Sequence, residues 1–167
     1  MKKFLLVLAV MFGLSTTAMA QQKGDAFIGG AIGFSAGTDS ATSFGLAVEG
    51  GGFVANRLAL SGEVAYNLVA GEINVITVGP KLSYYARLAD KFYYTPGVSV
   101  VGAYVNVGGA DTGNIGVGLD LAAFEFRPTQ HFGMKVNLFS MSAMFNNGFS
   151  FSADMMMNTS VSFRYYF

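Results

Sequence analysis

The last nineteen residues of the chain, 149–167, alternate between two kinds of side chain, and this alternation limits the possible fold more than any other feature. Counted from Phe149, every second residue up to Phe167 is apolar, aromatic or small, whereas most residues between them are polar or charged. A period of two predicts one continuous β-strand with two different faces. At about 3.3 Å per residue the strand would be roughly 60 Å long, well beyond the average strand of about 5–6 residues.

A strand of this kind suits a lipid bilayer, because a tilted membrane strand needs only about 9–11 residues in the hydrocarbon, with aromatic residues at the interfaces. The chain also ends on Phe167, with Tyr165 and Phe163 on the same face. This ending resembles the C-terminal signal by which outer-membrane β-barrels are recognised for assembly. The sequence is thus similar to the small OmpA/OmpX-like outer-membrane barrels of Gram-negative bacteria. The resemblance implies an all-β, transmembrane, antiparallel up-and-down barrel, with the assembly signal at these three residues.

The N-terminus predicts export. Two lysines precede an apolar run at residues 4–14, and an Ala-Met-Ala sequence at residues 18–20 offers a small-x-small cleavage site. We therefore expect a cleaved signal peptide at residues 1–20 and a single barrel domain at residues 21–167. The alternative is an uncleaved anchor, but the apolar run has about eleven residues where a membrane helix needs about twenty.

The composition agrees with a barrel whose outer wall meets lipid. Apolar residues make up 52% of the chain, yet beyond the leader no apolar run approaches the length of a membrane helix. A soluble domain with so few charges would have difficulty covering its surface. The chain has no cysteine, so neither disulfides nor thiolate metal sites are expected. Without the leader it has eight basic and ten acidic residues, which gives no electrostatic case for binding nucleic acid.

Eight alternating segments follow one another after the leader. They are residues 26–34, 44–54, 58–68, 73–88, 92–107, 115–127, 131–145 and 149–167. The alternation slips near Ala122-Ala123, where we expect a β-bulge, and again near Phe139-Ser140.

An even number of strands places both chain ends on one side of the membrane. We expect that side to be periplasmic, with short turns there at Asn56, Asp90 and Pro128. The four outward connections are also short, at no more than about ten residues each.

The charged side chains of these segments fall on the inward face of the predicted barrel. The set is Glu49, Glu63, Lys81, Arg87, Asp120, Glu125, Lys135 and Arg164. A lysine or arginine facing lipid at the bilayer centre would cost about 2–4 kcal/mol. Because the lumen of an eight-stranded barrel is only wide enough for side chains to fill, we predict a network of salt bridges.

In that network Lys81 pairs with Glu63, and Lys135 pairs with Asp120 or Glu125. Arg164 closes the network towards the first strand. The alternative is a set of solvated lumen residues without specific partners.

No pattern of residues predicts catalysis or metal binding. His131 is the only histidine and follows the turn at Pro128, whereas barrel enzymes of similar architecture use a histidine near the outer rim. We therefore expect a girdle or turn histidine. Two of the three methionines at residues 155–157 should face lipid and fill space rather than bind a soft metal. We expect no enzyme activity, no cofactor and no metal.

Three functions fit such a barrel. The first is a structural or surface-interaction protein with a polar, mostly plugged lumen. It would contact the outer-membrane bilayer, the barrel assembly machinery and, through strands that project outward, a surface partner. The second is a porin-like narrow pore for ions or small solutes, favoured by small inward residues such as Gly29, Ala31 and Gly33. The third is a soluble lipocalin-like carrier, which would need an apolar lumen and outward charges. We expect the first, as a monomer.

Overall fold

The computed structural model describes residues 22–35, 42–69, 73–146 and 148–167, so the predicted signal peptide at residues 1–20 lies outside the described residues. The described chain forms ten strands. They are β1 (Ala26–Ser35), β2 (Ser43–Ala55), β3 (Leu58–Val69), β4 (Ile73–Tyr84), β5 (Ala86–Ala89), β6 (Phe92–Tyr94), β7 (Gly97–Val107), β8 (Ala110–Phe126), β9 (Phe132–Asn146) and β10 (Gly148–Tyr166). No helix among these residues is long and apolar enough to cross a membrane.

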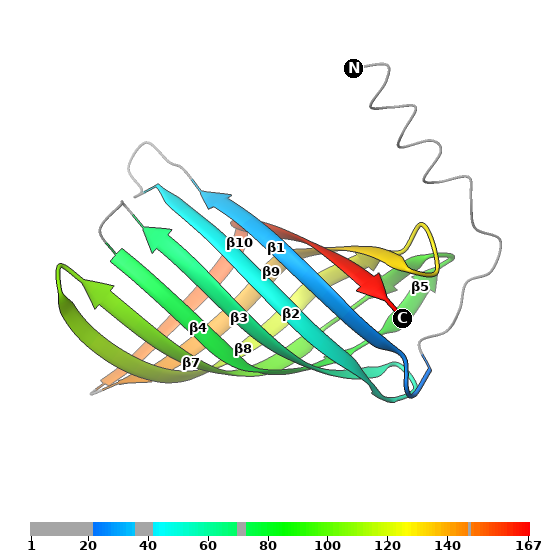
Figure 1. Ribbon diagram of the computed structural model, residues 1–167, viewed down its shortest axis with the longest axis horizontal. Coiled ribbons are helices and arrows are strands. Elements are labelled where there is room, and N and C mark those ends of the chain that lie inside the picture. Colours follow the sequence, from blue (N-terminus) through cyan, green and yellow to red (C-terminus); the bar gives the residue numbers. More distant parts are fainter. Residues whose placement is uncertain (1–21, 36–41, 70–72, 147) are drawn as a thin grey trace, which may run out of the picture.

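Eight of the strands close into an antiparallel ring, in the order β1, β2, β3, β4, β7, β8, β9 and β10. The ring is closed by the antiparallel pairing of β1 with β10. Figure 1 shows these strands tilted side by side around a barrel, with the C-terminus and β5 at the same end. The predicted all-β, eight-stranded barrel is therefore confirmed.

The remaining two strands, β5 and β6, form a short hairpin that continues β4 and β7 at one end of the barrel. The segments predicted at residues 73–88 and 92–107 are thus each interrupted, at Tyr85 and at residues 95–96. Pro96 has no backbone N–H, so it cannot donate a hydrogen bond to a neighbouring strand. At the two interruptions the backbone amides still find acceptors. The amide of Tyr85 donates to the carbonyl of Arg57 (2.7 Å), and the amide of Thr95 donates to the carbonyl of Ala123 (2.7 Å).

Both predicted slips in alternation are present. The pairing of β8 with β9 shifts between Asp120 and Ala123, and the facing residues on β9 jump from Phe139 to Asn137. As a result Leu121 is exposed on the outside, whereas Ala123 and Glu125 are buried inside. The bulge therefore turns Glu125 into the lumen.

We call the two ends of the barrel the termini end and the loop end. At the termini end the amide of Phe167 donates to the carbonyl of Ala26 (2.9 Å). The turns after β2 and after β5 lie at this end too, where Arg57 and Lys91 adopt positive φ angles of 66° and 61°. The connections β1–β2, β3–β4, β7–β8 and β9–β10 lie at the loop end.

The wall has an apolar outside and a polar inside. Outward residues such as Ile32, Val64 and Val78 are more than half exposed. In contrast, Glu125 and Arg164 are 0% and 1% exposed. A soluble protein rarely leaves such a belt of apolar side chains uncovered, whereas a membrane barrel places it against lipid.

Candidate functional site: the charged lumen

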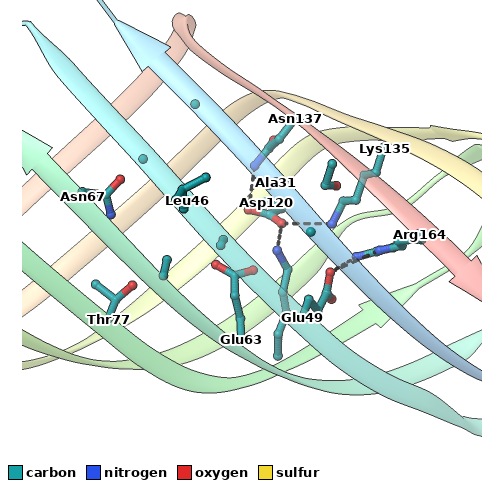
Figure 2. Close-up of a pocket in the computed structure, with 17 residues that line it drawn as sticks. Ala31, Leu46, Glu49, Glu63, Asn67, Thr77, Asp120, Lys135, Asn137 and Arg164 are labelled. Atoms are coloured by element: carbon teal, nitrogen blue, oxygen red, sulfur yellow. Dashed lines mark hydrogen bonds and ion pairs between the residues drawn. The ribbon is translucent and has the colours of Figure 1, made fainter.

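The inward charges gather in two groups at different heights in the barrel. We call the group nearer the termini end the arginine cluster; it consists of Glu49, Tyr85, Glu125, Arg127, Arg164 and Tyr166. We call the second group the lysine cluster; it consists of Lys81, Asp120, Lys135 and Asn137. Figure 2 shows Glu49 and Arg164 to one side of the Asp120 carboxylate within the same lumen.

The arginine cluster depends on an empty position in the wall. In the ladder Gly29 of β1 lies opposite Glu49 of β2 and opposite Arg164 of β10. A Cβ atom on Gly29 would lie 2.9 Å from Cγ of Arg164 and 2.9 Å from the carbonyl oxygen of Phe163. Because Gly29 has no side chain, Arg164 reaches across β1 to Glu49.

Arg164 is the centre of the cluster. Its Nη2 donates to Oε2 of Glu49 (2.6 Å), and its Nε donates to the same oxygen (3.2 Å). Its Nη1 donates to Oε2 of Glu125 (2.8 Å) and to the hydroxyl of Tyr85 (2.5 Å). One guanidinium thus neutralises two carboxylates that come from strands on opposite sides of β10.

The two carboxylates are fully hydrogen bonded. Oε1 of Glu49 accepts from the hydroxyl of Ser61 (2.8 Å). Oε1 of Glu125 accepts from Nε of Arg127 (2.7 Å) and from the hydroxyl of Tyr166 (2.5 Å). A buried charge is tolerated only when it is paired and hydrogen bonded in this way.

Aromatic rings enclose the cluster on the termini side. The guanidinium carbon of Arg127 lies 3.3 Å from the ring centre of Tyr166 and within 6 Å of the rings of Phe53, Tyr85 and Tyr93. The guanidinium carbon of Arg164 lies 4.9 Å from the ring centre of Phe27. These cation–π contacts hold the charged groups in a dry setting.

The lysine cluster has a single carboxylate. Lys81 of β4 forms an ion pair with Asp120 of β8. Nζ of Lys135 donates to Oδ2 of Asp120 at 3.5 Å, and Nδ2 of Asn137 donates to its Oδ1 at 2.9 Å. Two ammonium groups therefore share one negative charge.

Two of the predicted lumen residues behave differently from the prediction. Lys81 pairs with Asp120 and not with Glu63; among the described residues Glu63 has no ion pair. In the ladder of β3 and β4, Lys81 lies opposite Ser61, whereas Glu63 lies opposite Gly79, so the predicted partners are offset by two residues. The pairing with Asp120 is possible because the lumen is narrow enough for a side chain to reach past β7.

Arg87 does not join the lumen network. It lies in β5, beyond the break at Tyr85, and its Nη2 donates to Oδ1 of Asp90 (2.9 Å). The Arg87 side chain is 45% exposed. The alternation places it on the inward face, but the hairpin carries it past the mouth of the barrel to the solvent.

The lumen keeps an unfilled space beside both clusters. A cavity of about 260 Å³ runs from Arg164 past the lysine cluster to small residues of β1 and β2, such as Ala31, Gly33 and Gly45. A second cavity, of about 140 Å³, lies between Glu63 and Ser99 on the side of β4 and β7. Glu63 lines both cavities.

The residues considered for catalysis or metal binding lie elsewhere. Nδ1 of His131 is 2.9 Å from the carbonyl oxygen of Tyr166, and its ring stacks on Tyr165 with centres 5.7 Å apart. The described residues contain no group of three or more His, Cys, Asp or Glu side chains that could hold a metal. The side chains of the three methionines at residues 155–157 lie outside the described residues.

The residues predicted as an assembly signal face outward. Phe163 and Tyr165 are about half exposed, and Phe167 is 70% exposed. The ring of Tyr165 packs edge-on against that of Phe167, with centres 5.3 Å apart. Tyr166 lies between Tyr165 and Phe167 in the sequence, but its side chain points inward and binds Glu125. The end of the chain therefore contributes side chains both to the outer surface and to the lumen.

Sequence reasoning missed three members of the arginine cluster, although alternation offered a signal for each of them. Arg127 follows Glu125 by two residues, and Tyr166 follows Arg164 by two, so each shares the inward face of a residue already identified. Tyr85 precedes Arg87 by two residues and had the same signal. The role of Gly29 depends on the ladder register, which the sequence does not reveal.

Comparison with solved structures identifies the architecture. The chain matches Neisserial surface protein A with a TM-score of 0.56 and 14% identity, covering 84% of this chain and 95% of that one. It matches the outer membrane protein Ail of Yersinia pestis with a TM-score of 0.51 and 10% identity, covering 85% of this chain and 99% of that one. It matches the N-terminal β-barrel domain of Pseudomonas aeruginosa OprF with a TM-score of 0.50 and 13% identity, covering 88% of this chain and 100% of that one. The fold is that of the small outer-membrane β-barrels. No protein-family model and no curated protein matches the chain.

Proposed function

We propose that this chain is an integral outer-membrane protein whose closed barrel has a structural or surface-interaction role and no enzyme activity. The observation that supports the proposal is the arginine cluster, whose charged side chains are buried and paired in the lumen near the termini end. Arg164 and Glu125 are 1% and 0% exposed there, and aromatic rings enclose the same level. We propose that this end faces the periplasm, with the loop end at the cell surface.

A solute that crosses the lumen at this level has to displace the arginine cluster. Breaking a buried pair leaves an uncompensated charge, at a cost of about 3–5 kcal/mol. The contacts of Arg164 come from β2, from β8 and from Tyr85 between β4 and β5, so one ion pair cannot open without disturbing the others. This coupling supports a closed barrel.

A free strand edge at the loop end supports the surface role. β10 pairs with β1 only from Val161 to Tyr166. Within the described residues, the edge of β10 that faces β1 therefore has no strand partner from Gly148 to Ser160. Such an edge offers backbone groups to an extended segment of a partner. We expect protease added to intact cells to cut the β9–β10 hairpin, and full protection would contradict its exposure.

The test of the closed barrel is the conductance of the refolded protein in a planar bilayer. Heat-modifiable migration on a gel first establishes that the barrel is folded. We expect a silent bilayer for the unmodified protein and for Arg87→Ala, which alters a charge outside the lumen. Discrete current steps from the folded, unmodified protein would overturn the proposal.

The second candidate function is a narrow pore for ions or small solutes. The cavity of about 260 Å³ favours it, because the lumen is open over part of its length. In that case the current steps should grow when Lys81 and Lys135 are each replaced by alanine, since both side chains occupy the lumen beside the cavity.

A further inference from the structure

The charges in the lumen are not balanced locally. The arginine cluster has two guanidinium groups and two carboxylates, so its charges cancel. The lysine cluster has two ammonium groups around Asp120, which leaves one positive charge in excess. Glu63 has no ion pair among the described residues and supplies the compensating negative charge at another place on the wall.

Both excess charges border the same space. Glu63 and Lys135 line the cavity of about 260 Å³, and they come from β3 and β9, which β2, β1 and β10 separate around the ring. Figure 2 shows Glu63 and Lys135 on different sides of the Asp120 carboxylate. A molecule in this cavity therefore meets, on one wall, the carboxylate of Glu63, which has no ion pair among the described residues. On the other wall it meets the ammonium of Lys135, which shares the Asp120 carboxylate with Lys81.

The neutral part of the lining offers further polar partners. Asn67 and Thr77 line the cavity beside Glu63. Oδ1 of Asn137 is buried and has no hydrogen-bond partner in the protein, although Nδ2 of the same amide binds Asp120. A buried acceptor without a partner favours a donor supplied by a bound molecule.

The size of the cavity limits the ligand. A volume of about 260 Å³ is below the usual range for drug-sized ligands, which starts at about 300 Å³. The space arises because the inward positions of β1 and β2 hold alanine and glycine. A Cβ atom on Gly33 would meet no other atom within 4 Å.

The geometry points to a binding site for a small zwitterion of the amino-acid class in this cavity, with its carboxylate towards Lys135 and its ammonium towards Glu63. A simple anion would leave Glu63 without a counter-charge, and a simple cation would be repelled by Lys81 and Lys135. The inference goes beyond the proposed function, because a closed barrel needs no ligand. It is also tested separately from conductance.

The experiment is calorimetric titration of the folded protein in detergent micelles with glycine, β-alanine and γ-aminobutyric acid, which differ in the distance between their charges. Glycine ethyl ester carries only the positive charge, and N-acetylglycine only the negative one. We expect at least one zwitterion to saturate, with an affinity about tenfold or more above those of both singly charged compounds. Absence of saturation by all three zwitterions, or equal affinity for a singly charged compound, would overturn the inference.

Two pairs of variants locate the site. Gly33→Leu should abolish binding by filling the cavity, whereas Gly50→Leu makes the same change on the exposed outer face, where a Cβ atom also meets nothing within 4 Å, and should leave the affinity unchanged. Glu63→Gln should weaken binding about tenfold, and Arg87→Gln, outside the lumen, should not. Heat-modifiable migration shows that each variant is folded. Equal binding by folded Gly33→Leu and Gly50→Leu would contradict a lumen site.

Discussion

Both charged clusters hold ion pairs inside the lumen of a membrane barrel, but the two clusters differ in how far their side chains are exposed. In the ion pair of Arg164 with Glu125 the side chains are 1% and 0% exposed, whereas in that of Lys81 with Asp120 they are 14% and 12% exposed. A guanidinium presents a planar fork that can bridge several acceptors, whereas an ammonium acts as a compact, strongly hydrated point charge. Arginine therefore suits the dry level enclosed by aromatic rings, and lysine suits the level that borders a cavity.

We expect the largest loss of stability for Arg164→Met. The substitution leaves the carboxylates of Glu49 and Glu125 buried without their shared counter-charge, which should lower the free energy of unfolding by about 3–5 kcal/mol. The measurement is the urea midpoint of the gel-mobility transition of the refolded barrel. A loss below about 1 kcal/mol would mean that the two clusters do not differ in the way described.

The second prediction concerns the empty position beside Arg164. Gly29→Val should push against the Arg164 side chain and the Phe163 carbonyl, and should destabilise the barrel by about 1–3 kcal/mol. Gly62→Val is the matched control, because a Cβ atom there meets nothing within 4 Å. Equal urea midpoints for the two variants would show that Arg164 does not need the space left by the missing side chain of Gly29.

We expect a smaller loss of stability when a residue of the lysine cluster is replaced. After Lys81→Met, Asp120 keeps its contacts with Lys135 and Asn137, and the cavity gives water access to the carboxylate. The free energy of unfolding should fall by about 1 kcal/mol. If the loss in a urea titration equalled that of Arg164→Met, the lysine level would be as dry as the arginine level.

The smallest effect is expected outside the lumen. Arg87 pairs with Asp90 at the solvent-exposed end of a hairpin. Arg87→Ala should change the free energy of unfolding by less than about 0.5 kcal/mol, because exposed pairs contribute little. A larger loss in the same urea titration would show that β5 and β6 contribute to the closure of the lumen.

Alternation predicted the eight strands of the ring and the inward face of most charges, and the resemblance to outer-membrane barrels implied that the ring is closed. Alternation also predicted the bulge near Ala122 because the apolar phase changes within one segment. It did not predict the partner of Lys81, since a partner depends on the height in the ladder and on which strands face each other across the lumen. Arg87 shows the same limit: the phase of a residue does not reveal where the wall ends.

Gly29 also bears on the order in which the molecule is completed. Arg164 comes from the last strand and Glu49 from the second, and they meet across the first, at the seam where the two ends of the chain join. Until β10 pairs with β1, Glu49 lacks its counter-ion and Glu125 has only Arg127, so an unfinished barrel holds one uncompensated acid in its wall. Closing the ring therefore also neutralises Glu49, and the ion pair between β10 and β2 stabilises the seam from inside the lumen.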